Sequence, residues 1–350
     1  MSGPGRGAAG LYHDRASRLC ELVSAFDGVP VLVLADLCLD EFLYAEISRV
    51  SREAPVLIVE HRRLEAMPGG GANAVHNIRT LGGRPVPVGV VGDDEAGRRL
   101  LALLREAGVA TDGIRVEERY ATPVKTRVLA ALPHSRPQQV VRIDKGAIHS
   151  VEAAAARAGA ERAMELLPGA SALLLSDYSY DFVRPDLASP LVDAARQRRI
   201  PVTSDSRKRG REFTGVTAAT PNLEEAEEIL GWPLAEEGAR LREAGERLRT
   251  TLRADNILIT RGGKGMLLFE AGRPPAEVPV FGTDEVADVT GAGDTVIAAF
   301  TLALASGASP LEAALLANAA AGLVVMKRGT ATITPCELTS ALRSASSARE

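Results

Sequence analysis

The chain has 350 residues, of which 46% are hydrophobic and 25% charged, and its formal net charge is −4. This is an ordinary globular composition, and the lack of a basic excess argues against a nucleic-acid partner. The three cysteines are scattered, and no apolar run approaches the roughly 20 residues of a membrane span, so we expect a cytoplasmic protein without disulfides or a membrane contact.

The hydrophobic pattern predicts alternating helices and strands. We expect a flexible tail and an N-terminal helix at residues 1–28, and one domain at residues 29–345. Strands buried on both faces are predicted at 29–40, 172–177, 200–205 and 256–260. Helices are predicted between them at 100–108, 154–167 and 223–231. This order predicts a parallel sheet covered by helices on both sides.

Two β-rich, charged segments interrupt this order. They lie at 46–66 and 122–146, and neither contains a helical pattern. We therefore predict a small second sheet outside the main one, built from about 43–66 and 118–146.

The stretch DVTGAGDTVIAAF (288–300) predicts an anion site. A strand-like segment (285–289) precedes the glycines, and a helical pattern follows as far as Gly307. Free N–H groups at a helix N-terminus attract anions, and glycines allow a close approach. No Gly-Lys-Ser/Thr follows, which disfavours a P-loop. We interpret Gly291 to Asp294 as an anion hole beside a carboxylate that accepts an alcohol proton, although helix capping alone is the alternative.

A second glycine motif, PGGGAN, occupies residues 68–73. Three consecutive glycines before Ala-Asn and a helical pattern favour close backbone approach to a ligand over a plain turn. Asp40 ends the first predicted strand, where an aspartate either contacts a ligand or caps a turn.

These motifs together resemble the ribokinase-like (PfkB) family of sugar kinases. TPNLEEAE (220–227), TRGGKG (260–265) and ANAAAG (317–322) resemble further motifs of that family, and the similarity extends from about Pro30 to about Ser340. The resemblance implies an α/β protein with a three-layer α/β/α fold, a mainly parallel central sheet and a small β-sheet lid. Such lids often form homodimers.

Four segments narrow the resemblance to the kinase half of ADP-heptose synthases: 48–56, 138–144, 176–178 and 290–300. This implies ATP-dependent phosphorylation of C1 of D-glycero-D-manno-heptose 7-phosphate, with a separate nucleotidyltransferase acting in the same pathway. Two alternatives remain open. One is a kinase of this family for another sugar, sugar phosphate or nucleoside, and the other is a sugar- or nucleotide-binding regulator without catalysis.

The resemblance also implies roles for individual residues. Asp294 is the expected base, and the expected anion hole consists of Gly291, Ala292 and Gly293. The expected sugar contacts are Asp40, Gly70, Gly71 and Asn73. The expected nucleotide contacts are Asn222, Glu225, Lys208, Gly263, Gly265 and Asn318. Glu225 is also expected to hold Mg²⁺ through water, and Asp288 and Gly329 to surround a monovalent cation such as K⁺.

A phosphorylated sugar needs cations at its distal end, and arginine binds phosphate in a bidentate manner. We predict Arg49, Lys125 and Arg127 of the lid as this clamp, the alternative being a solvated lid surface.

The chain departs from the family at three places. Ala35 replaces a glycine, and Tyr180 and Asp181 stand where the heptose kinases commonly have Lys-Gly. DSRKRG (205–210) replaces Asp-Pro-Lys, so either Arg207 or Lys208 supplies the phosphate contact.

Overall fold

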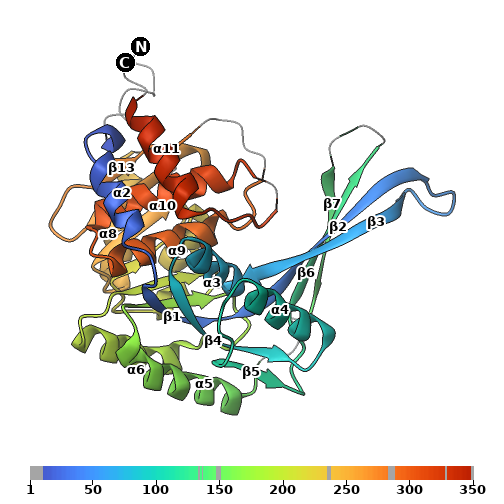
Figure 1. Ribbon diagram of the computed structural model, residues 1–350, viewed down its shortest axis with the longest axis horizontal. Helices are drawn as coiled ribbons and strands as arrows, with labels where there is room; N and C mark the ends of the chain where they lie inside the picture. The colour runs from blue at the N-terminus through green and yellow to red at the C-terminus, as the bar shows by residue number, and fades with distance from the viewer. Residues whose placement is uncertain are drawn as a thin grey trace.

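The computed structural model describes residues 11–132, 135, 137–146, 151–234, 238–282, 288–327 and 329–347. These residues form a nine-stranded main sheet and a separate four-stranded sheet (Figure 1). In the main sheet β12 and β13 pair antiparallel at one edge, and the other described strand pairs are parallel. The main strands, in spatial order, are β13 (Ala276–Val278), β12 (Met266–Glu270), β11 (Asn256–Thr260), β10 (Ala218–Ala219), β9 (Val202–Ser206), β8 (Ala172–Asp177), β1 (Pro30–Ala35), β4 (Arg84–Gly92) and β5 (Ile114–Glu117).

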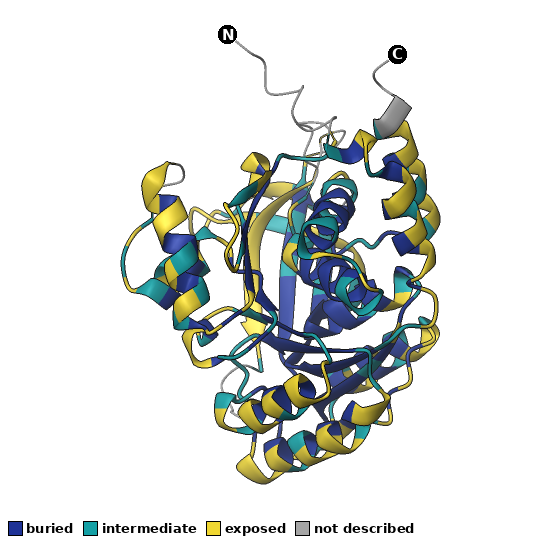
Figure 2. Ribbon diagram, turned by 90° about the vertical axis from the view of Figure 1, so that its left-hand side faces the viewer, coloured by how far each residue is buried: buried dark blue, intermediate teal, exposed yellow. Residues whose placement is uncertain are grey.

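Helices cover both faces of this sheet, with their buried sides toward it (Figure 2). One face carries α2 (Ala16–Ser24), α3 (Gly71–Thr80), α4 (Glu95–Glu106), α9 (Ala292–Ala305), α10 (Pro310–Val324) and α11 (Pro335–Ser347). The other carries α5 (Ala153–Leu166), α6 (Pro185–Gln197), α7 (Leu223–Leu230) and α8 (Ala239–Thr251). Along β1, Val31 and Val33 enter the first core, while Leu32 and Leu34 enter the second. Because both faces are buried, this strand is apolar at every position.

The second sheet is the predicted lid. It consists of β3 (Leu57–Gly70), β2 (Leu37–Val50), β6 (Val124–Ala131) and β7 (Gln138–Lys145), in this order, and it extends away from the main body (Figure 1). Its first two strands are longer than the predicted 43–66, since they begin at Leu37 and end at Gly70.

The expected single strand at 29–40 is wrong. β1 ends at Ala35, and β2 begins at Leu37 in the lid, so Asp36 lies at the point where the chain changes sheets. Of the expected strand at 285–289, residues 285–287 lie outside the described residues, and Asp288 and Val289 are not in a strand. Within the described part of the chain, no helix combines the length and hydropathy needed to cross a lipid bilayer.

Candidate active site

A cleft of about 400 Å³ lies between the carboxyl ends of the main-sheet strands and the lid. Such strand ends are the usual ligand sites of parallel sheets. Its described lining residues are Asp40, Gly70, Lys125, Arg127, Gln139, Arg142, Tyr178, Asp205, Arg207, Thr220, Asn222, Glu225, Thr260, Val289, Thr290, Gly291, Gly293 and Asp294. The cleft therefore joins Asp294 and two of the predicted anion-hole glycines to the lid cations Lys125 and Arg127.

The N-terminus of α9 opens into this cleft. Gly291 adopts the left-handed conformation (φ 78°), and its carbonyl accepts a hydrogen bond from Thr295 N–H at 3.0 Å. The N–H groups of Gly291, Gly293 and Asp294 have no hydrogen bond to any described residue. Ala292 N–H, in contrast, donates to the Val289 carbonyl at 3.2 Å. The expected donor Ala292 is therefore wrong, because the tight turn uses its N–H group.

Asp294 is 5% exposed, and both of its carboxylate oxygens accept hydrogen bonds. Tyr178 Oη donates to Oδ1 at 2.6 Å, and Asn73 Nδ2 donates to Oδ2 at 2.8 Å. Burial raises the pKa of Asp294 to about 6, while these two hydrogen bonds act in the opposite direction. At neutral pH Asp294 is ionised, and it is a stronger base than an exposed aspartate.

Two of the expected sugar contacts have internal roles instead. Asn73 is fully buried; its Nδ2 donates to Asp294, and its Oδ1 accepts from Asn77 at 3.1 Å. Gly71 donates its N–H to the Asp36 carbonyl at 3.0 Å, and a Cβ atom there would lie 2.7 Å from the Ala35 side chain. The structure thus corrects both expectations: Asn73 holds the Asp294 carboxylate, and Gly71 allows α3 to pack against β1.

Asp40 and Arg127 form an ion pair at the lid side of the cleft. Arg127 Nη1 lies 2.9 Å from Asp40 Oδ1, but neither atom is aligned for a hydrogen bond with a described residue. Asp40 is 3% exposed, so its Oδ1 is a buried acceptor that lacks a donor. A buried polar atom of this kind is unfavourable unless a ligand bonds to it.

Lys125 is a buried cation of the cleft. It is 7% exposed and has neither a hydrogen bond nor an ion pair with any described residue. Its Nζ lies 4.7 Å from the ring centroid of Tyr178 and 5.6 Å from that of Tyr180. A buried ammonium without a carboxylate is costly unless an anionic ligand neutralises it.

At the opposite wall the structure favours Arg207 over Lys208. Arg207 lines the cleft, its Cζ lies 4.5 Å from the Tyr178 ring centroid, and its charge lowers the pKa of Asp294. Lys208 is not among the described lining residues. Of the two residues expected for the phosphate contact, Arg207 therefore lies in the described cleft and Lys208 outside it.

Asn222 and Glu225 form the N-terminal capping box of α7. Asn222 Oδ1 accepts from Glu225 N–H, and Glu225 Oε2 accepts from Asn222 N–H, both at 2.9 Å. The second carboxylate oxygen of Glu225 has no hydrogen bond among the described residues and belongs to a side chain that lines the cleft. Asp205 lies beside it, and desolvation together with Glu225 raises the pKa of Asp205 well above its usual value.

The sequence profile of the pfkB family carbohydrate kinases matches residues 36–336. The chain belongs to the pfkB family of carbohydrate kinases. This kinase transfers a phosphoryl group to an alcohol group of a carbohydrate, which confirms the expected family and reaction class.

The kinase is 42% identical over 321 residues to the bifunctional protein HldE of Azotobacter vinelandii, and 41% identical over 316 residues to that of Pectobacterium atrosepticum. These alignments cover 91% and 89% of the kinase chain but only 64% and 63% of the relatives. The kinase therefore spans less than two thirds of the length of these curated relatives.

Solved structures with the same fold confirm the expected architecture. Phosphofructokinase-2 of Escherichia coli, in complex with substrates and products, has a TM-score of 0.73 and 21% identity, covering 91% of the kinase and 99% of that chain. Ribokinase of Arabidopsis thaliana, complexed with ribose and ATP, has a TM-score of 0.70 and 21% identity, covering 90% and 99%. The kinase has the three-layer ribokinase-like fold with its lid.

Two of the three predicted clamp residues line the cleft, and the third does not. Lys125 and Arg127 line the cleft, whereas Arg49 is exposed near the far end of β2 and is not among the described lining residues. Arg142 of the lid, which is not one of the three predicted clamp residues, also lines the cleft, and it holds Asp144 through two hydrogen bonds of 2.9 Å. Arg142 lies opposite Arg127 in the pairing of β6 with β7. A prediction of that pairing would therefore have placed Arg142 in the cleft.

Of the expected nucleotide residues, Asn222 and Glu225 line the described cleft, whereas Gly263, Gly265 and Asn318 do not. Gly263 is exposed, and Gly265 is buried with φ 75°, where a Cβ atom would lie 2.2 Å from the Val278 carbonyl oxygen. Asn318 is buried in α10, and its Nδ2 donates to Tyr12 Oη and to the Pro279 carbonyl, each at 2.8 Å. The side chain of Asn318 therefore does not line the cleft. It connects α10 to Tyr12 and to the segment at Pro279.

The two residues expected around a monovalent cation lie next to each other. Asp288 Oδ2 accepts a hydrogen bond from Gly329 N–H at 3.1 Å, and Asp288 Oδ1 accepts one from Thr290 N–H at 2.9 Å. Asp288 thereby connects the loop before α9 to the segment after α10.

The sequence did not predict which side chain fixes the loop at residues 177–183. The buried carboxylate of Asp36 accepts hydrogen bonds from four backbone N–H groups of this loop, at 2.8–3.1 Å: those of Tyr178, Tyr180, Phe182 and Val183. Burial and the neighbouring Asp177 raise the pKa of Asp36, while these donors lower it. The only sequence signal was an aspartate at the end of β1.

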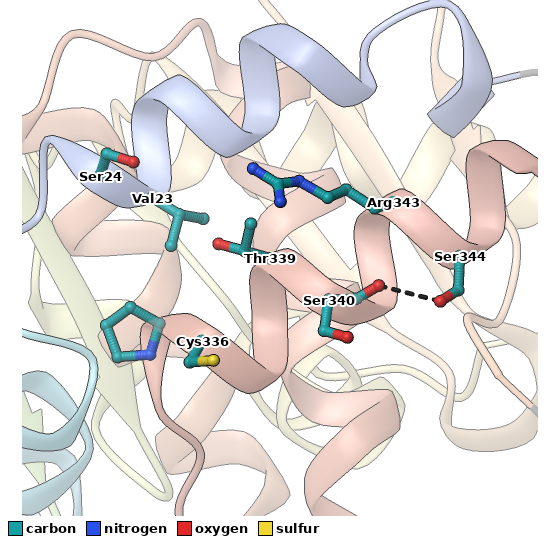
Figure 3. A pocket seen from close by; sticks show the side chains of 8 residues that line it. Val23, Ser24, Cys336, Thr339, Ser340, Arg343 and Ser344 are labelled. Carbon is teal, nitrogen blue, oxygen red and sulfur yellow. Dashed lines mark hydrogen bonds between the residues drawn. The ribbon is translucent and has the colours of Figure 1, made fainter.

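A second hollow, of about 780 Å³, lies between α2 and α11 (Figure 3). Its lining residues are Val23, Ser24, Pro335, Cys336, Thr339, Ser340, Arg343 and Ser344. This set includes neither a carboxylate nor a glycine loop, so it offers no base and no anion hole. It therefore lacks the groups that the cleft at Asp294 combines.

Proposed function

We propose that this kinase phosphorylates C1 of D-glycero-D-manno-heptose 7-phosphate with ATP as phosphoryl donor. One observation carries the proposal: the cleft offers two separate anion sites, the α9 N-terminus beside Asp294 and the ammonium of Lys125 in the lid, which has no ion pair with a described residue. The first suits the phosphoryl group in transfer, and the second suits a phosphate that the acceptor already carries. The HldE relatives support the heptose assignment.

In the proposed reaction the C1 hydroxyl donates its proton to Asp294 while its oxygen attacks the γ-phosphorus of ATP. The new bond is C1–O–P, the bond that breaks joins this phosphorus to the bridging oxygen, and ADP leaves. The unpaired N–H groups of Gly291, Gly293 and Asp294 face the charge that develops on the phosphoryl oxygens. One such donor typically contributes about 3 kcal/mol to transition-state stabilisation.

The carboxylates on the cleft floor fit Mg²⁺. Asp205 and Glu225 both line the cleft, and desolvation raises the pKa of each. Mg²⁺ in kinases is held by one or two carboxylates together with substrate phosphates, and it neutralises phosphate charge. Glu225 would hold it through water, with Asp205 beside it.

For the monovalent cation we propose the segment that Asp288 and Gly329 bring together. The carboxylate of Asp288 is already fixed by two N–H donors, so it can add a third interaction without moving. Activity in K⁺ compared with Na⁺ at equal ionic strength tests this site, and equal activities would contradict it.

The lid supports a homodimer. It exposes large apolar side chains on β3 and β7, among them Leu57, Leu64, Val141 and Ile143, each 46–50% exposed. Exposed apolar groups of this kind mark interaction surfaces. Sedimentation of the wild type and of Leu64→Glu tests the dimer, which we expect to dissociate in the variant. The proposal also includes a nucleotidyltransferase, outside this kinase domain, that acts in the same pathway.

The decisive experiment measures ADP release with a panel of free and 7-phosphorylated heptoses and matched hexoses. We expect kcat/KM to be highest for the heptose 7-phosphate and at least 100-fold lower for the free heptose, because Lys125 then lacks its anion. Equal rates with free sugars would favour a family kinase for another acceptor. Binding without ADP release for every sugar would favour a regulator.

A further inference from the structure

Tyr178 lies closer to the base than any residue to which a role has been given above. Its Oη is 2.6 Å from Asp294 Oδ1, and Asn73 holds the other oxygen at 2.8 Å. A carboxylate has about four lone-pair sites, so Oδ1 can accept a second hydrogen bond from a sugar hydroxyl while Tyr178 stays in place.

The structure holds Tyr178 at both its backbone and its ring. Its N–H donates to Asp36 Oδ2 at 2.9 Å, which anchors the main chain. The ring centroid lies 4.7 Å from Lys125 Nζ and 4.5 Å from Arg207 Cζ, so two cations flank the aromatic group. A side chain fixed at both ends is suited to orienting its partner rather than to moving aside.

Tyr178 is a hydrogen-bond donor at every physiological pH. Desolvation and the charge of Asp294 raise the pKa of Tyr178 well above its usual value, so the phenol keeps its proton. A donor to a carboxylate favours the ionised form. Of the influences that lower the pKa of Asp294, the bond from Tyr178 is the largest.

We propose that Tyr178 is a positioning residue that keeps Asp294 oriented and ionised, and that it is not a placeholder displaced by the acceptor hydroxyl. This inference rests on the proposed role of Asp294 as base. The titratable and charged groups that face Asp294 from the surrounding elements are Cys38, Asp40, Tyr178, Asp205 and Arg207. Tyr178 is the one of these that donates to its carboxylate.

The test is Tyr178→Phe, with Tyr180→Phe as matched control. Tyr180 lies on the same loop and stacks beside Tyr178 at 6.5 Å, but it gives Asp294 no hydrogen bond. We expect Tyr178→Phe to lower kcat/KM at pH 7 and to move the acid limb of the kcat/KM profile upward by about one pH unit, which is a tenfold change in proton affinity. The control should retain the wild-type limb.

Unchanged or increased kcat/KM in Tyr178→Phe would mean that Tyr178 is displaced by the acceptor, and a lower kcat with an unmoved acid limb would mean a purely structural role. Either result overturns the inference. A measurement without substrate separates this failure from failure of the proposed function. The difference in unfolding free energy between Asp294→Asn and its parent protein depends on pH. When both proteins also carry Tyr178→Phe, this dependence should extend to a pH about one unit higher than in the wild-type background. No movement there overturns the inference even if the acceptor has been misassigned.

Discussion

The Asp294→Asn variant should be more stable than the wild type at neutral pH while losing activity. Asn has the shape of Asp, its Oδ1 can accept from Asn73, and its Nδ2 can donate to Tyr178 Oη. The Tyr178 O–H loses its acceptor, but Tyr178 lines the cleft and its hydroxyl can turn to solvent, so the main change is the loss of a buried negative charge.

The magnitude follows from the pKa of Asp294, which is 3.8 without perturbation and about 6 in the folded protein. Because the folded pKa is the higher one, the contribution of Asp294 to stability is complete below pH 3.8, declines as the pH rises to about 6, and is constant above. The ionised group therefore destabilises the native state by about 1.6 kcal/mol at pH 5 and about 3 kcal/mol at pH 8. The side chain is almost fully buried, so solvent screening reduces these values little.

The measurement is equilibrium urea unfolding of wild type, Asp294→Asn and the control Asp112→Asn, each at several pH values from 5 to 8. Asp112 is exposed, so its variant removes the same charge without changing burial. We expect the advantage of Asp294→Asn to grow by about 1.4 kcal/mol across this range, and its turnover to fall by about 10²-fold or more. A pH-independent difference, or a variant less stable at pH 8, would refute the description of Asp294 as a desolvated base.

Three further predictions concern the walls of the cleft. Lys125→Met should raise the acceptor KM about tenfold or more with little effect on the KM for ATP, whereas Arg49→Met should change neither; the reverse pattern would place the clamp at the far end of the lid. Arg207→Met should lower kcat about 10²-fold, while Lys208→Met should stay within twofold of wild type, and equal losses would contradict the choice between them. Asp36→Asn should lower the free energy of unfolding by about 1–3 kcal/mol for each N–H donor left unpaired, together with kcat, and a variant with wild-type stability and kcat would show that Asp36 does not hold the loop.

The sequence predicts those parts of the site that depend on neighbouring residues. The helix beginning at Gly291 and the carboxylate at Asp294 follow from a turn and a helical pattern a few residues long. Likewise, alternation in the lid predicts a strand that carries both Lys125 and Arg127. These features are local, and so propensity and spacing are enough to find them.

The parts that the sequence did not reveal depend on contacts between distant segments. Asn73 and Asp294 are 221 positions apart, and nothing near Asn73 indicates which carboxylate it bonds. Asn318 has the same difficulty, since its partner Tyr12 is 306 positions away. Ala292 is a different case. Its turn was predicted in the right place, but its N–H group is already bonded to the Val289 carbonyl within that turn.

Two departures from the family compensate each other in three dimensions. Asp181 stands where heptose kinases commonly have glycine, and it adopts φ 68°, a left-handed conformation that glycine prefers and aspartate tolerates. Its carboxylate pairs at 2.9 Å with Arg209, a residue of the other unusual segment, DSRKRG. Arg209 also holds the buried Asp177 at 2.7 Å. The same loop is therefore held by Asp36 through its backbone and by Arg209 through Asp181 and Asp177, and these contacts place Tyr178 against Asp294.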